Sequence, residues 1–251
     1  KDYYHVKSAV SEDRAVLWLM ERDGQTSTDM PMCREEDLPY FFHQLEEYFA
    51  EVLHKPFYIA LADEEAVQYL GLDPKEYEVE EQVDLKDYLY DGEAMRTLAG
   101  KKLHKKKNHL NAFMREYEGR YEYRRLCCSD RHEVWEFMER WRQKKADADA
   151  LEDSLEYEVA GIHEILKNCS SLSVRMAAVY VDGQMEAFTI GSMNERENMA
   201  VIHIEKANPD IKGLYQFINQ QFLVNEFPDA ALVNREDDVG MEGLRKAKMS
   251  Y

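Results

Sequence analysis

Apolar residues recur along the chain with the two spacings that distinguish helices from strands. In residues 34–55 they recur every three or four positions from Leu38 to Val52, which predicts an amphipathic helix. Residues 15–21 and 57–62 are short apolar runs with polar or charged residues on both sides, which is typical of buried strands. The first part of the chain is therefore predicted to alternate strands and helices.

The second part of the chain has a more regular order. Residues 120–128 alternate as a strand, and two helical patterns follow. Residues 172–207 contain three strands separated by two turns, and a helix, a short strand and a closing helix from about Gly240 complete the order. This order of elements resembles the core of the GNAT acyltransferases. We therefore predict an α+β, tandem GNAT-like chain with a degenerate half, 1–118, and a second half, 119–251, each with a mixed central sheet flanked by helices.

The overall charge limits which partners are expected. With 50 acidic residues against 32 Lys and Arg, the chain carries a formal net charge of −18, which opposes general binding to nucleic acid. Residues 96–125 depart from this balance, because they contain ten Lys or Arg and only three Glu. Such a local basic surface favours one site for an anionic ligand.

Apolar runs and cysteines bear on the cellular compartment. No apolar run approaches the roughly 18 to 20 residues of a transmembrane helix. The four cysteines, Cys33, Cys127, Cys128 and Cys169, lack the spacing of a zinc site, and adjacent cysteines rarely bridge each other. We therefore expect reduced core thiols, no metal site and a cytoplasmic location.

The densest part of the basic segment, residues 101–117, is predicted to be a helix with two different stripes. Its apolar residues lie along one stripe, while Lys101, Lys105 and Asn108 lie along another. Cations and a neutral donor on one stripe can clamp the phosphate groups of a ligand. The alternative is a solvated, lysine-rich helix face that binds nothing.

A second candidate site lies in residues 201–213. In a regular strand His203 and Glu205 point to the same face, which suggests a catalytic base or a group that orients an amine. The alternative is a polar outer face. The loop that follows, residues 206–213, contains one glycine, a proline and Asp210, so it lacks the backbone freedom to wrap a pyrophosphate. This loop counts against coenzyme A as the donor.

The third candidate is the C-terminal stretch, residues 233–251, in which acids precede a predicted helix with bases. Gly240 and Gly243 belong to a stripe of small residues, which is expected to let this helix press against the sheet. Arg245 and Lys248 are three positions apart and can point at one ligand. Complementing the helix dipole explains the order of the charges. It does not explain the glycines, each of which costs about 1 kcal/mol inside a helix.

Taken together and in this order, three segments resemble one known family. Residues 87–113, 203–222 and 233–251 are similar to the C-terminal domain of phosphatidylglycerol lysyltransferases, and more closely to its free-standing bacterial relatives. The resemblance implies a tandem GNAT fold, as in the Fem aminoacyltransferases, with aminoacyl-tRNA as the donor. It assigns the positions of the family motifs to Lys101, Lys105, Lys106, Asn108, Glu205, Asn234, Arg235, Asp238, Gly240, Gly243, Arg245 and Lys248.

The leading hypothesis is an aminoacyl or acyl transferase of the aminoacyl-tRNA-dependent type, which needs no cofactor. An acceptor amine or hydroxyl would attack an activated carbonyl, with Glu205, Asp238 or His203 orienting or deprotonating it. Arg245 and Lys248 would offset negative charge, and the basic helix would hold the acceptor end of a tRNA. The acceptor would be a small molecule, a peptide or a lipid headgroup. The alternatives are an acyl-CoA-dependent N-acyltransferase and a non-catalytic binding module on the same fold.

Overall fold

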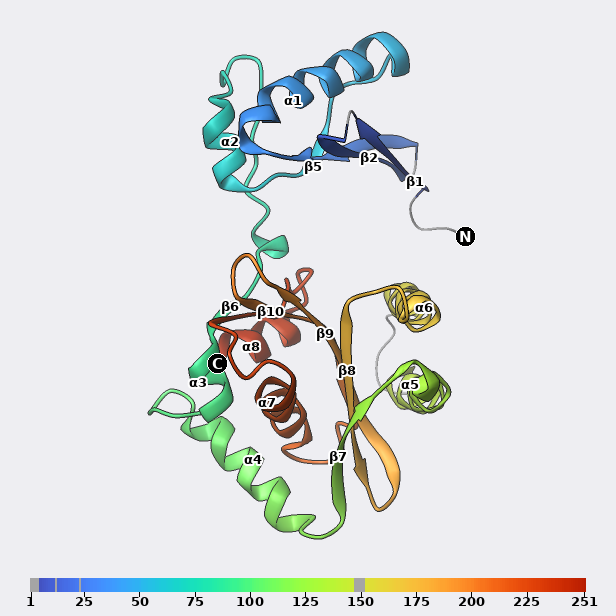
Figure 1. Cartoon of the computed structure of the whole chain (residues 1–251), viewed down its shortest axis with the longest axis vertical. Helices are drawn as coiled ribbons and strands as arrows, with labels where there is room; N and C mark the ends of the chain where they lie inside the picture. The colour runs from blue at the N-terminus through green and yellow to red at the C-terminus, as the bar shows by residue number, and fades with distance from the viewer. Residues whose placement is uncertain (1–4, 12, 23, 147–151) are drawn as a thin grey trace. The chain divides into compact units, whose positions relative to one another are not determined.

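The computed structural model describes residues 5–11, 13–22, 24–146 and 152–251 (Figure 1). The chain forms two compact units, Lys1–Glu81 and Gln82–Tyr251. The predicted halves, 1–118 and 119–251, do not coincide with these units, because the residues just before 119 pack in the core of the second unit. That the predicted halves are two copies of one fold stays a prediction.

The first unit contains a mixed sheet with helices beside it. Its strands are β1 (His5–Ser11), β2 (Ala15–Arg22), β3 (Gln25–Asp29), β4 (Met32–Cys33) and β5 (Ile59–Leu61). They follow the order β1-β2-β3-β5, with β4 paired to β2, and β3 and β5 run parallel. The helical segments are η1 (Glu35–Asp37), α1 (Leu38–Glu47), η2 (Tyr48–Leu53) and α2 (Glu64–Leu70).

The predicted amphipathic helix is present as α1 and η2. Its buried side chains are Leu38, Phe41, Phe42, Leu45 and Phe49. The apolar stripe ends there, since η2 is a π-helical turn and Val52 is 59% exposed. The wider turn has more residues per revolution than an α-helix, so it rotates the last positions of the stripe away from the core.

The second unit is built on a six-stranded sheet in the order β6-β11-β10-β9-β8-β7. The strands are β6 (Leu89–Asp91), β7 (Tyr121–Leu126), β8 (Val174–Val181), β9 (Gln184–Asn194), β10 (Met199–Ala207) and β11 (Leu232–Asn234). Strands β10 and β11 pair in parallel and the other neighbours pair antiparallel. The helical segments are η3 (Val83–Leu85), α3 (Gly92–Thr97), α4 (His104–Glu116), η4 (Cys128–Asp130), α5 (Arg131–Ala146), α6 (Glu152–Asn168), α7 (Leu214–Glu226) and α8 (Glu242–Met249). From β7 onward, the order is the one predicted.

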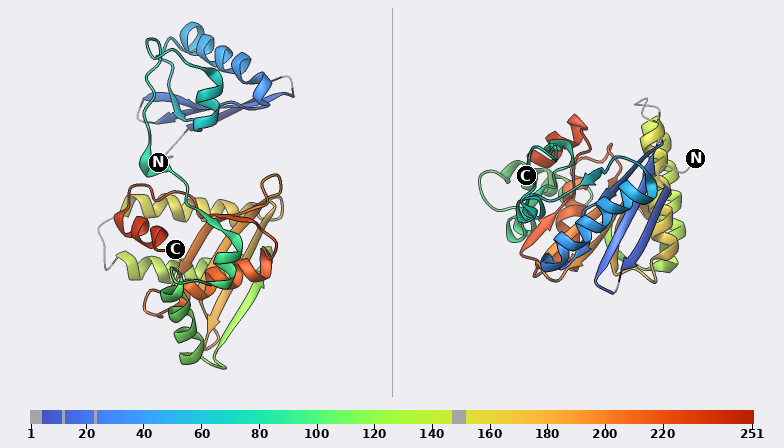
Figure 2. Two further views of the ribbon diagram at one scale, coloured as in Figure 1. Left: turned by 90° about the vertical axis from the view of Figure 1, so that its left-hand side faces the viewer. Right: turned by 90° about the horizontal axis from the view of Figure 1, so that it is seen from above.

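Helices cover both faces of this sheet (Figures 1 and 2). On one face α3, α4 and α7 pack around Phe113, Phe217 and Phe222, which are at most 2% exposed. On the other face α5 and α6 pack around Phe137 and Phe188. The middle of the sheet is therefore buried on both sides, which is why β8 and β9 contain near-continuous apolar runs.

The cysteines differ from the expectation of reduced core thiols. Cys128 and Cys169 form a disulfide, because η4 and the end of α6 meet beside the same core cluster. Cys33 is partly exposed and Cys127 is exposed, and both are free. The expectation was wrong for the bridged pair, since 41 residues of sequence separate two cysteines that the fold brings together.

Within residues 5–11, 13–22, 24–146 and 152–251, none of the helices combines the length and the apolar character that crossing a membrane requires. Within the same ranges, His, Cys, Asp and Glu side chains form no group of three that could hold a metal ion.

Candidate active site around Glu205

A buried carboxylate lies near the end of the central strand β10. Glu205 Oε1 accepts a hydrogen bond of 3.0 Å from Arg235, and Oε2 accepts one of 2.7 Å from Asn219 Nδ2 on α7. The side chains of Glu205 and Arg235 are only 8% and 14% exposed. A buried charge is tolerated when a partner charge and hydrogen bonds replace its water, and both are present here.

Arg235 reaches Glu205 because of how the sheet ends. Strand β11 pairs with β10 over three residues only and stops at Asn234. The next residue therefore leaves the ladder beside the unpaired part of β10, where its long side chain extends to Glu205. Asn234 itself fixes the departing turn, since its amide donates to Asp87 and its oxygen accepts from the Glu236 N–H, both at 2.6 Å.

The basic helix α4 contributes one cation to this place. Lys106 Nζ lies 3.8 Å from the centroid of the Tyr251 ring, and the Arg235 guanidinium lies 5.0 Å from the same centroid. Burial, followed by the charge of Arg235, lowers the pKa of Lys106 to about 8, and the charge of Glu205 opposes this shift. Lys106 is therefore still mostly protonated near neutral pH, but it loses its proton at a lower pH than an ordinary lysine does.

The other basic positions of this segment face solvent. Lys101, Lys105 and Asn108 are exposed, and Asn108 contacts His104 at 3.3 Å. An open hollow of about 570 Å³ lies between α3 and α4. Its lining is Leu98, Ala99, Gly100, Lys101, His104 and Lys107. Of the predicted cations, Lys106 thus belongs to the Glu205 site and Lys101 to a separate basic hollow.

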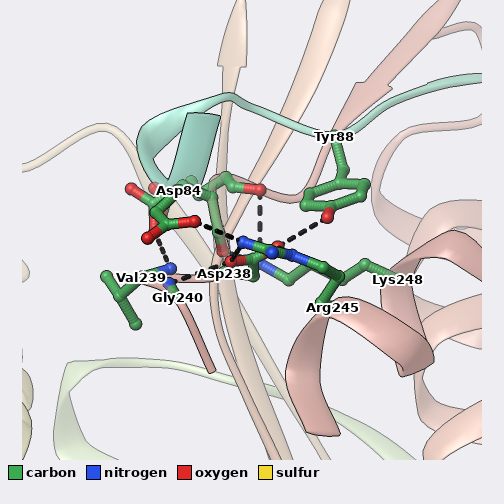
Figure 3. A network of polar contacts seen from close by, with 9 residues as sticks. Asp84, Tyr88, Asp238, Val239, Gly240, Arg245 and Lys248 are labelled. Atoms are coloured by element: carbon green, nitrogen blue, oxygen red, sulfur yellow. Dashed lines mark hydrogen bonds and ion pairs between the residues drawn. The ribbon is translucent and has the colours of Figure 1, made fainter. Parts of the chain in front are cut away.

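One acid of the C-terminal stretch, Asp238, is buried and bound within the protein (Figure 3). Asp238, which is 1% exposed, accepts hydrogen bonds from Arg245 Nε and Nη2 at 2.8 Å, from the Tyr88 hydroxyl at 2.6 Å and from the Gly240 N–H at 2.9 Å. The hydrogen bonds from Arg245, followed by the one from Tyr88, hold the pKa of Asp238 well below its usual range. This carboxylate is saturated and ionised, so it is poorly suited to act as a base.

Arg245 and Lys248 do not converge on one open ligand site. Arg245 binds Asp238 and also donates to Asp84 at 2.6 Å. Lys248 is 7% exposed, and its Nζ donates to the backbone carbonyls of Arg235, Glu236 and Asp237. Both cations therefore fix the loop between β11 and α8, and through it they fix Arg235.

The two glycines of this stretch have different environments. Gly240 precedes α8 and adopts a φ of 75°, and a Cβ there would come within 3.0 Å of Asp84 Oδ2. Gly243 lies on α8, is exposed, and a Cβ there would meet nothing within 4 Å. Close packing of a small-residue stripe against the sheet was thus a wrong expectation, because that stripe of α8 faces solvent.

Alanine substitutions at these two glycines are expected to have opposite effects on stability. Gly240→Ala is expected to lower the free energy of unfolding by about 1–2 kcal/mol, because an L-residue is strained in the left-handed region. Gly243→Ala is expected to raise it by up to about 1 kcal/mol, since alanine is the better helix former. Urea denaturation of both variants measures the difference. Equal destabilisation of the two would contradict this assignment and return Gly243 to a packing role.

His203 and Glu205 lie on opposite faces of the sheet, contrary to the expectation from regular alternation. The register of β10 against β9 shifts between Ile202 and Ile204. This β-bulge adds one residue to β10, and a shift of one residue reverses the facing of everything after it. Glu205 therefore faces α7, whereas His203 lies on the face that α5 and α6 cover in part.

His203 has partners of its own. Its Nδ1 lies 2.7 Å from Glu236 Oε1, and its Nε2 lies 2.8 Å from Ser192 Oγ on β9. The sequence predicted neither partner, because Ser192 and Glu236 are brought beside His203 by strand pairing and by the turn after β11.

Other residues of the Glu205 site also escaped sequence reasoning. Asn219 lies within the apolar face of α7 and is 2% exposed, and a polar residue at a core position of a helix was a usable signal. Tyr251 follows the last helix, outside any periodic pattern, so no signal indicated that its ring would contact two cations.

The whole chain matches one known protein family. The family model for the phosphatidylglycerol lysyltransferase C-terminal domain matches residues 1–251. The chain belongs to this family. The family resemblance inferred from the three motifs is therefore confirmed, and the two motifs that supply Glu205 and Arg235 meet in the structure.

Solved structures share the family fold. A conserved protein of unknown function from Bacteroides thetaiotaomicron is 27% identical with a TM-score of 0.87, and the match covers 99% of this chain and 82% of that one. The L-PGS of Bacillus licheniformis is 14% identical with a TM-score of 0.67, over 98% of this chain and 80% of that one. The predicted α+β fold class, with mixed central sheets flanked by helices, is thus confirmed.

One relative among curated proteins extends beyond this chain. An uncharacterised protein of Mycoplasmoides gallisepticum is 29% identical over 166 residues, which cover 66% of this chain and 52% of the relative. The match therefore spans about half of that relative's length. Membership of the family and the GNAT-like fold together support an acyltransferase-type function.

Proposed function

We propose that this chain transfers an activated aminoacyl group to an acceptor amine or hydroxyl, with Glu205 at the reacting centre. The observation that supports this most is the meeting of distant segments at one buried carboxylate. Strand β10 supplies Glu205 and the turn after β11 supplies Arg235. Helix α4 brings Lys106 to the same Tyr251 ring that Arg235 contacts.

In the proposed reaction Glu205 orients the attacking group and accepts its proton. Asn219 Oδ1 is buried and has no hydrogen-bond partner among the described residues, while its Nδ2 donates to Glu205. An N–H of a substrate amine would satisfy this oxygen, which otherwise carries an uncompensated desolvation cost. Arg235 and Lys106 would offset the negative charge that develops on the tetrahedral oxygen. Arg245 and Lys248 position Arg235 in this scheme, and Asp238 positions Arg245.

The donor is proposed to enter from the side of α4. The basic hollow with Lys101, His104 and Lys107 offers cations for an anionic tail such as the acceptor end of a tRNA. The Tyr251 ring is 8% exposed and contacts both Lys106 and Arg235, so a donor that reaches these cations has to displace it.

Coenzyme A is the less favoured donor for a structural reason. A CoA pyrophosphate would need the free N-terminus of the helix after the central strand, which here is α7. Gly213 caps α7, and a Cβ on it would lie 2.1 Å from the backbone oxygen of His109. The backbone of α4 thus packs directly against the start of α7, where a pyrophosphate would need space.

A transfer assay tests the proposal. The full chain is incubated with a mixture of tRNAs charged with radiolabelled amino acids and with amine, peptide and lipid-headgroup acceptors, and labelled product is separated from tRNA. Glu205→Gln is expected to form product about 100-fold more slowly, which is within the range of losing a general base. Glu195→Gln, at an exposed position, serves as the matched control and should keep full activity.

Two results would contradict the proposal. One is that the wild-type chain forms product no faster than Glu205→Gln, although thermal unfolding shows that both proteins are folded. This result would favour the non-catalytic binding module. The other is stabilisation of the chain by CoA, together with acetyl transfer from acetyl-CoA, which would favour the N-acyltransferase.

A further inference from the structure

A second polar constellation lies on the face of the sheet opposite Glu205. Ser192 Oγ, His203 Nε2 and His203 Nδ1 form a continuous hydrogen-bonded chain that ends at Glu236 Oε1, with distances of 2.8 Å and 2.7 Å. An ionised carboxylate only accepts hydrogen bonds, so Nδ1 of neutral His203 carries the proton. Its Nε2 is then the acceptor for the Ser192 hydroxyl, which is the arrangement that activates a serine nucleophile.

Local departures from regular structure create this arrangement. The β-bulge between Ile202 and Ile204 turns His203 toward Ser192. Glu236 adopts a φ of 56°, an uncommon value for a residue that is not glycine. Its N–H donates to Asn234 Oδ1 at 2.6 Å and its carbonyl accepts from Lys248 Nζ at 3.2 Å, so neighbouring groups hold the strained conformation.

The three side chains are accessible, so burial does not require them to bind one another. His203 is 31% exposed, Glu236 is 43% exposed and Ser192 is half-buried. Polar groups with this exposure can be satisfied by water, and exposed pairs contribute little to stability. A gain in stability therefore does not by itself explain why the backbone of Glu236 adopts a strained conformation that places its carboxylate beside His203 Nδ1.

We propose that Ser192, His203 and Glu236 form a nucleophilic triad that acts on activated carboxylic esters, an activity beyond the aminoacyl transfer proposed for the Glu205 site. Ser192 Oγ forms a bond to the ester carbonyl carbon, and its proton moves to His203 Nε2. The C–O bond to the alcohol breaks, and the leaving oxygen takes that proton from His203. Water, deprotonated by the same nitrogen, then releases the carboxylic acid and restores Ser192. Glu236 holds the imidazole and stabilises its charged form.

Labelling with an alkyl fluorophosphonate tests the triad in the full chain. This probe forms an Oγ–P bond with an activated serine and releases fluoride, and peptide mass spectrometry locates the adduct. We expect the adduct on Ser192, its loss in Ser192→Ala, and its retention in Ser171→Ala, which changes an exposed serine. Glu236→Gln and His203→Gln are expected to slow labelling at least tenfold.

Hydrolysis of 4-nitrophenyl acetate provides a second measurement that does not depend on the probe. The wild-type chain should release a burst of 4-nitrophenol equal to the number of chains, and Ser192→Ala should not. An adduct on other serines, or equal labelling rates in the wild type and His203→Gln, would overturn the proposal. Neither assay contains a charged tRNA, so failure here leaves the aminoacyl-transfer proposal to its own test.

Discussion

Arg235→Met is expected to lower the free energy of unfolding by about 3–5 kcal/mol, because it leaves a buried carboxylate without its cation. The side chains of Arg235 and Glu205 are 14% and 8% exposed and meet at 3.0 Å, so bulk water cannot replace the lost partner. Methionine keeps an unbranched apolar stem and part of the packing, so most of the change is the loss of the charge and its hydrogen bonds. Urea denaturation with a common m-value measures the loss.

A double variant identifies the cause of that loss. In Arg235→Met/Glu205→Gln the carboxylate is neutralised as well, and we expect at least half of the lost stability to return. Arg196→Met removes an exposed arginine and should change stability by no more than about 0.5 kcal/mol. If the double variant were less stable than Arg235→Met, the buried pair would not explain the effect, and loss of packing against Tyr251 would.

Lys248→Met is expected to lower the free energy of unfolding by about 3 kcal/mol. The Nζ group donates to three consecutive backbone carbonyls, and hydrogen bonds to a charged group contribute about 1.5–3 kcal/mol each, with part of the loss recovered by water. The loop that they hold contains Arg235 and Glu236, one residue from each proposed site. We therefore expect both aminoacyl transfer and fluorophosphonate labelling to weaken together in this variant.

The neighbouring lysine on the same helix provides the control for Lys248. Lys246 lies two residues earlier on α8 and is exposed, so Lys246→Met removes the same charge without removing contacts. Denaturation curves and both activity assays of the two variants are compared at one ionic strength. Similar losses in Lys246→Met and Lys248→Met would show that net charge, and not the bound carbonyls, is responsible.

Patterns within one element were predicted well from the sequence. The spacing of apolar residues in residues 34–55 and the order of elements from residue 120 onward both appear in the structure. Each depends on contacts between near neighbours and on a periodicity of 2.0 or 3.6 residues, which the sequence contains directly. The two motifs that contain Glu205 and Arg235 were also recognised, because each of them is local in the sequence.

Partners within the sites were predicted less well. Arg245 was expected at the reacting centre, yet Arg235 contacts Glu205 while Arg245 binds Asp238. Both arginines sit in the same short motif with similar chemistry. Their difference depends on where β11 stops relative to β10, which is a matter of strand pairing and not of side-chain type.

The sequence by itself determined the fold class, the order of elements from residue 120 onward, the basic segment around α4 and the family. Only the tertiary structure decided which polar groups meet. One extra residue in β10 put His203 and Glu205 on opposite faces, which created two sites where the sequence predicted one. Such a bulge is set by how β10 pairs with β9, and the alternation of apolar residues within β10 does not by itself show where the register shifts.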